Sequence, residues 1–123
     1  MNELASLLLH SQTQTHIFHL RVTGPGSYAA HKALQKYYEG IDELVDGLVE
    51  MYQGKYGLVE FGTISKIDNN TSLPNIIDYI SKLADAVMVL RQVDTLQDSF
   101  IQNEIDNVMS LLYSTKYKLV NLQ

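Results

Sequence analysis

The 123-residue sequence contains no cysteine. This absence excludes disulfides, thiolate metal sites and cysteine nucleophiles. Histidine and carboxylate side chains are therefore the ligands left for a metal ion, so any metal chemistry must use nitrogen and oxygen atoms.

The sequence also lacks a long hydrophobic run. No segment approaches the roughly 20 consecutive apolar residues that a membrane span requires. No basic residue precedes the short apolar run at residues 7–9, which is unlike a signal peptide. We therefore expect a protein without membrane association, located in the cytoplasm, or within a viral particle if a virus encodes it.

Basic residues are scarce as well. The sequence has 9 Lys and Arg residues against 14 Asp and Glu residues, a net charge of −5, and no basic tail. Because nucleic-acid affinity comes mainly from clustered cations, DNA binding is expected to be weak or absent. Lys116 and Lys118 leave room for a local basic patch only.

What the sequence does contain is helical periodicity. Its length suits one domain, residues 1–123, and apolar residues recur at spacings of three and four in four segments. The first runs from about residue 2 to 22, and the second from Ser27, a good N-cap, to about Tyr52. The third opens at Ser72 and ends near Thr95, and the fourth follows Asp98, a second candidate cap.

The breaks between these segments suggest how the helices connect. Residues 23–26 form a tight turn, residues 54–72 a long connection rich in Gly and Asn, and residues 95–98 a short link. A short, a long and a short connection are typical of a ferritin-like four-helix bundle, with a crossover between helices 2 and 3. The expected fold class is all-α.

Four residues are candidate metal ligands: His19, His31, Asp46 and Glu50. His19 and His31 lie 6 positions before and after Pro25, so an antiparallel hairpin brings them to the same height. On the second helix, Gln35, Asp46 and Glu50 lie within about 100° of His31 on one face, away from the core residues. Asp46 is nevertheless about 22 Å along the axis from His31, and Glu50 about 28 Å.

Two copies of the chain could complete the site. Crossing two such helices antiparallel about a two-fold axis near residues 39–40 places His31 of one copy beside Asp46 and Glu50 of the other. Gly40 would permit a close approach there. Tyr38, Val45 and Val49 would supply apolar surface for the contact.

Simpler interpretations of the same residues remain open. The acidic residues of the second helix could be an ordinary solvated face, and a lone histidine such as His19 is more often structural than a ligand. His10 and His16 have no matched partner, and we assign them no role. A di-iron site inside the bundle is disfavoured, because no Glu has a His three positions later.

The segment from His19 to His31 resembles the signature of the Dps-type mini-ferritins. In that family a His-Trp-x-Val-x-Gly-Pro stretch leads to a second His 12 positions after the first, and His19 and His31 have this spacing. In the family an Asp and a Glu follow the second His by 15 and 19 positions, and Asp46 and Glu50 lie at these positions here. Tyr38 also matches a recurrent Tyr. The resemblance runs without gaps from His19 to Glu50.

The resemblance implies an iron site shared between subunits. His19 and His31 of one subunit would face Asp46 and Glu50 of its two-fold mate, and these four residues would bind and oxidise Fe(II). Hydrogen peroxide is the oxidant that the resemblance suggests. Ferric iron would be stored in a homo-oligomeric shell built from two-fold dimers, for which a dodecamer is one candidate size.

The sequence departs from the family pattern near this site. Gln35 stands where the family usually has Asp. A neutral amide binds iron more weakly than a carboxylate, or lies beside the ligands without binding the iron itself. Leu20 replaces a Trp, Met51 replaces an Arg, and the chain lacks a basic N-terminal tail. The alternative function is therefore a non-catalytic ferritin-like assembly subunit, for example of a larger or viral particle, with a degenerate metal site.

Overall fold

The computed structural model describes residues 1–62, 64 and 66–123 of the chain. These residues form four α-helices and one short 3-10 helix, and they contain no β-strand. The elements, in chain order, are α1 (Asn2–Arg21), α2 (Ser27–Tyr56), α3 (Leu73–Leu90), η1 (Asp94–Leu96) and α4 (Ser99–Asn121). The expected all-α bundle is confirmed for this part of the chain.

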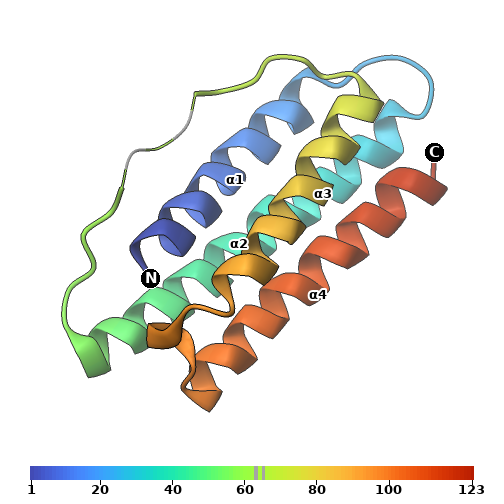
Figure 1. The fold of residues 1–123 in the computed structure, drawn as a ribbon. Coiled ribbons are helices and arrows are strands. Elements are labelled where there is room, and N and C mark those ends of the chain that lie inside the picture. Colours follow the sequence, from blue (N-terminus) through green and yellow to red (C-terminus); the bar gives the residue numbers. More distant parts are fainter. Residues whose placement is uncertain (63, 65) are drawn as a thin grey trace.

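The four helices pack side by side as two hairpins (Figure 1). α1 and α2 are joined by the turn at residues 22–26, and α3 and α4 by the segment that holds η1. α2 packs mainly against α1 and α4, and α3 packs mainly against α4. The long connection between α2 and α3 returns along the outside of α1, so the turns of the two hairpins lie at opposite ends of the bundle.

Apolar stripes on all four helices form one continuous core. Its largest fully buried side chains include Phe18 of α1, Tyr37 and Ile41 of α2, and Ile80 of α3 and Ile105 of α4. Burying such a side chain stabilises the fold by roughly 1.5–3 kcal/mol. The core therefore holds α1 and α2 in the register that sets the candidate site.

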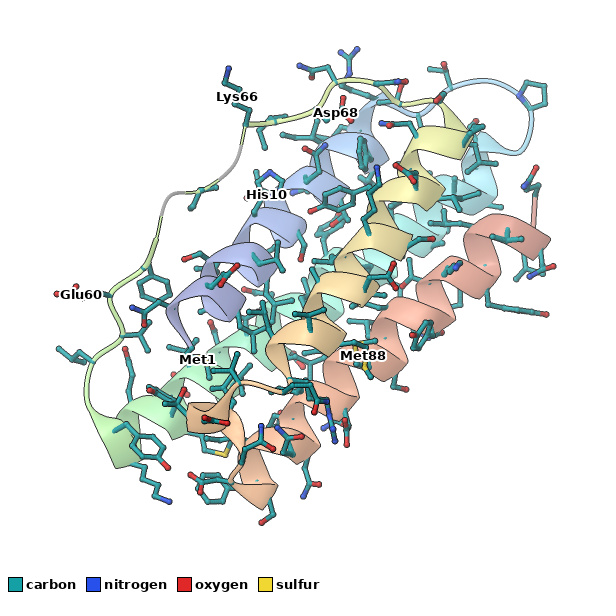
Figure 2. All side chains as sticks on the ribbon, in the orientation of Figure 1. Met1, His10, Glu60, Lys66, Asp68 and Met88 are labelled. Carbon is teal, nitrogen blue, oxygen red and sulfur yellow. The ribbon has the colours of Figure 1, made fainter. Side chains whose placement is uncertain are left out.

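α1 buries more polar side chains than any other helix. Gln14 donates to the Asp68 carbonyl and accepts from the Asp68 amide, both at 2.8 Å. The Ser6 hydroxyl accepts from the Gly62 amide at 2.8 Å. Figure 2 shows His10 directed toward this outer connection, where it bonds the Lys66 carbonyl. These contacts fasten the connection to α1.

Two helix ends differ from the sequence prediction. α2 continues four residues past Tyr52 and ends at Gly57, whose φ of 94° lies in the left-handed region. α3 ends at Leu90 rather than near Thr95, because the chain turns and forms the separate 3-10 helix η1.

Two predicted caps also differ. Gly26, with φ of 77°, occupies the N-cap of α2, and Ser27 is the first helical residue. Asp98 does hold the N-cap position of α4, but its carboxylate accepts from Lys55 at 2.9 Å and from the Tyr56 hydroxyl instead of capping the helix. The cap residue thus ties the end of α2 to the start of α4.

Within the described residues, no helix is both long and apolar enough to cross a membrane.

Candidate metal centre

The turn between α1 and α2 brings His19 and His31 together. Gly24 and Gly26 adopt φ values of 94° and 77°, which residues with a side chain rarely take, and this reverses the chain within a few residues. His19 lies in the last turn of α1, and His31 lies near the start of α2. Their rings stack with centroids 3.7 Å apart, as expected from their spacing around Pro25.

Each imidazole bonds the backbone of the other residue. Nδ1 of His19 lies 2.8 Å from the His31 carbonyl oxygen, and Nδ1 of His31 lies 2.8 Å from the His19 carbonyl oxygen. The His19 carbonyl is one of the last four of α1, which lack partners within their own helix. The pair therefore completes the hydrogen bonding of the helix end while fixing both rings.

These two hydrogen bonds determine the tautomer of each ring. A carbonyl oxygen only accepts, so each Nδ1 must carry the proton, and each Nε2 keeps a lone pair. Metal-binding histidines commonly have this arrangement, with one ring nitrogen donating to a carbonyl and the other left for the metal. Two ligand nitrogens of one ion lie at most about 4 Å apart, and the ring centroids of this pair lie 3.7 Å apart.

The near-parallel rings need one adjustment to share an ion. Their planes differ by 16°, whereas the lone pairs of two nitrogens that bind one ion must converge on it. His31 is only partly buried, so its ring has room to tilt. His19 is 8% exposed and has less freedom.

A third histidine, His16, lies beside the pair. Its ring stacks on Tyr38 with centroids 4.2 Å apart and lies 5.9 Å from the ring of His19. Tyr38 in turn meets the edge of the His19 ring at 5.2 Å. We assigned His16 no role, but its position three residues before His19 puts both on one helix face, and this signal was available in the sequence.

His10 has a structural role. Its Nδ1 lies 3.1 Å from the Tyr79 hydroxyl, and its Nε2 lies 3.1 Å from the Lys66 carbonyl. Both ring nitrogens are thus engaged between α3 and the outer connection, so His10 is not available as a ligand.

Asp46 and Glu50 are exposed on α2, on the face predicted from the helical period. They lie one turn apart, about four and five turns beyond His31. Among the described residues, no group of three or more His, Asp or Glu side chains is close enough to hold a metal ion. A single chain does not bring the four predicted ligands together, as their spacing along α2 requires.

Gln35 is held by a neighbour that the sequence reasoning overlooked. Its amide Nε2 donates to Oε1 of Glu39 at 3.0 Å. Glu39 lies one turn further along the same exposed face, between His31 and the Asp46 and Glu50 pair. The face therefore carries one more carboxylate than was predicted.

Two features proposed for a two-fold contact belong to the interior of the chain. A Cβ on Gly40 would lie 3.1 Å from Cδ2 of Leu111, so this glycine faces α4 and not a second copy. Val45 is 3% exposed and packs in the core. The interpretation of Val45 as an interface residue is wrong, because the core buries it, and partly exposed Gly40 faces Leu111 of α4 rather than the ligand face. Tyr38 and Val49 remain partly exposed.

The sequence of residues 19–119 matches the model of a protein family described as "Family of unknown function (DUF5856)". The match begins at His19 and covers all the candidate ligands. Neither the curated proteins nor the solved structures gave a match.

Proposed function

We propose an iron-oxidising function for this chain, which belongs to the DUF5856 family of unknown function. Fe(II) binds between two copies, to His19 and His31 of one and to Asp46 and Glu50 of the other. Hydrogen peroxide oxidises it, and ferric iron is stored in a homo-oligomeric shell. This is the function implied by the resemblance to the Dps-type mini-ferritins, within a ferritin-like bundle.

The paired histidines carry the proposal. A histidine that serves only the fold typically satisfies both ring nitrogens, as His10 does. In His19 and His31 the Nδ1 atoms alone are bonded to protein among the described residues. The two Nε2 atoms of these neutral rings keep their lone pairs, and such nitrogens bind Fe(II) well.

The carboxylates must come from a second copy. Asp46 and Glu50 are exposed and lie too far along α2 to reach the histidines of their own chain. An antiparallel crossing near residues 39–40 brings them to the partner's histidines and creates two equivalent sites in each dimer. Tyr38 and Val49 supply apolar surface beside the sites.

The donor set suits iron that changes its charge. Two Fe(II) ions each lose one electron, one hydrogen peroxide molecule gains both electrons, and with two protons its O–O bond breaks to give two water molecules. Carboxylate oxygens favour the more highly charged ferric product, whereas the imidazoles favour the ferrous ion. Iron is the substrate of this reaction.

Gln35 favours the second candidate, a ferritin-like subunit that serves assembly alone. Its amide is bonded to Glu39 and contributes no charge to the site. The acidic net charge of −5 argues against DNA compaction under either function.

Peroxide-dependent oxidation by the purified oligomer tests the proposal. We expect stoichiometric Fe(II) binding without oxygen, rapid oxidation when peroxide is added, and ferric iron that remains with the protein. His31→Gln is an informative variant, because its amide can still donate to the His19 carbonyl but offers no imidazole. Oxidation no faster than in buffer, by an intact wild-type oligomer, would select the assembly function instead.

A further inference from the structure

A groove with a volume of about 410 Å³ lies between the start of α2 and the end of α4. Its lining includes Tyr28, Lys32 and Lys36 from α2, and Lys118 and Leu122 from the end of the chain, together with two alanines of α2. A volume of this size suits a small organic ligand. No residue of the candidate metal centre lines it.

Positive charge is concentrated in this groove. The chain has only 9 Lys and Arg residues and a net charge of −5, yet Lys32, Lys36 and Lys118 all line the same hollow. None of the three forms an ion pair with a carboxylate of the described residues, whereas Lys55, Lys82 and Arg91 each do. An acidic protein thus holds three uncompensated cations at one place.

Lys36 is close enough to Lys118 to disfavour the charged form of Lys118. Burial and, after it, the ammonium group of Lys36 lower the pKa of Lys118 below its ordinary value. Bringing like charges together without a counterion is unfavourable. An anion between the two ammonium groups would remove this penalty and raise the pKa of Lys118.

An aromatic surface adjoins the cations. Tyr28 is 72% exposed, and Nζ of Lys32 lies 5.7 Å from its ring centroid. The Tyr28 ring also lies 6.3 Å from the ring of His31, so the groove adjoins the candidate metal centre without sharing a residue with it. Planar groups pack well on an exposed tyrosine ring, and base stacking on aromatic side chains is worth roughly 1–3 kcal/mol per base. The groove therefore offers a flat apolar surface beside a cationic one.

We propose that this groove binds a small organic phosphate with a planar ring, such as a nucleoside monophosphate. The phosphate contacts Lys36 and Lys118, the ring packs on Tyr28, and Lys32 contributes charge at the edge. This inference does not depend on the iron-binding function, because the two sites share no residue.

Calorimetric titration with adenosine 5′-monophosphate tests the site, with inorganic phosphate and adenosine as fragments of the probe. We expect the monophosphate to bind at least tenfold more tightly than either fragment. Lys36→Met and Lys118→Met should each weaken its binding roughly tenfold, because each removes a hydrogen bond to a charged group. Tyr28→Ala should weaken binding of the monophosphate but leave binding of inorganic phosphate unchanged.

Lys116→Met is the matched control. It makes the same change in charge on the same helix, but Lys116 lies about 160° around α4 from Lys118. We expect it to bind the monophosphate like the wild type. Circular dichroism should show that all four variants keep their helical content.

Titration of Lys118 provides a second readout. The pKa of Lys118, measured by NMR on methylated lysines, should rise when the monophosphate binds. Three results would overturn the proposal: no binding at millimolar monophosphate, equal weakening by Lys116→Met, or binding only of long polynucleotides, which would indicate a general electrostatic surface.

Discussion

Nδ1 of His19 bonds the carbonyl oxygen of His31, and Nδ1 of His31 bonds the carbonyl oxygen of His19, both at 2.8 Å. This reciprocal exchange couples the last turn of α1 to the first turns of α2. It also fixes which nitrogen of each neutral ring keeps its lone pair, so one structural device serves the hairpin and leaves both Nε2 atoms for the proposed iron. Under the proposed function, substitutions at either histidine should therefore affect both stability and metal binding.

Replacing Gln35 by Asp should strengthen iron binding. The new carboxylate lies on the same face of α2 as His31 and can bind the ion directly, whereas the amide of Gln35 is bonded to Glu39. We expect about tenfold tighter Fe(II) binding, in the range typical of changes around a metal site, and faster oxidation. Calorimetry under anaerobic conditions measures the affinity.

Gln92→Asp is the control for this change. It adds the same charge in the exposed turn after α3, away from α2. A similar gain in affinity from Gln92→Asp would show that the effect is general electrostatics and not coordination at position 35.

Self-association should respond to divalent cations. The exposed face of α2 carries Glu39, Asp46 and Glu50, so two such faces repel each other unless positive charge lies between them. We expect analytical ultracentrifugation to find a tighter oligomer with Mn²⁺, a redox-stable substitute for Fe²⁺, than with chelator. A stable monomer at micromolar concentration under both conditions would exclude the shared site.

The buried pair of Ser11 and Tyr37 gives a test of the fold. Their hydroxyls lie 2.7 Å apart, and the Ser11 hydroxyl donates to the Leu8 carbonyl, so the Tyr37 hydroxyl is the donor between them. Burial raises the pKa of Tyr37, and this keeps the hydroxyl protonated. Tyr37→Phe should cost about 1 kcal/mol of unfolding free energy, because Ser11 keeps its bond to Leu8.

Ser11→Ala should cost more than Tyr37→Phe, roughly 1–3 kcal/mol, because it leaves a fully buried hydroxyl without its partner. Urea unfolding measures both values. Equal losses of unfolding free energy in the two variants would indicate that, in Ser11→Ala, water or a rearranged group bonds the Tyr37 hydroxyl.

Two of the three helical glycines of α2, Gly40 and Gly47, should respond differently to substitution. A Cβ added at Gly47 would meet no neighbouring atom within 4 Å, so Gly47→Ala should raise the unfolding free energy by about 0.5–1 kcal/mol. At Gly40 the new methyl would lie 3.1 Å from the side chain of Leu111 and must displace it. We therefore expect Gly40→Ala to stabilise the fold less than Gly47→Ala does, or to destabilise it slightly, and to leave the oligomeric state unchanged. Thermal unfolding measures both stabilities.

The helices and the histidine pair were predictable because both follow from local periodicity. The stripe containing Tyr37 and Ile41 repeats at three and four residues, and Pro25 lies midway between His19 and His31. The surroundings of Gly40 were not predictable, since a helical wheel gives relative angles on one helix but not where α4 packs on it. The attachment of Gln14 to Asp68 was also missed, because the outer connection has no periodic pattern.

A mixing experiment tests the intersubunit geometry. His31→Ala and the double variant Asp46→Ala/Glu50→Ala should each abolish oxidation, because every site in either homo-oligomer lacks half of its ligands. Circular dichroism and ultracentrifugation establish that both variants fold and assemble before their activities are compared.

Refolding the two variants together should restore activity. In a mixed dimer one site lacks both halves, but the other combines an intact His19 and His31 pair with an intact Asp46 and Glu50 pair. Random pairing makes half of the dimers mixed, so about a quarter of the wild-type sites should return. If the mixed oligomer forms, as native mass spectrometry would report, and remains as inactive as its parents, then the ligands are not shared between chains.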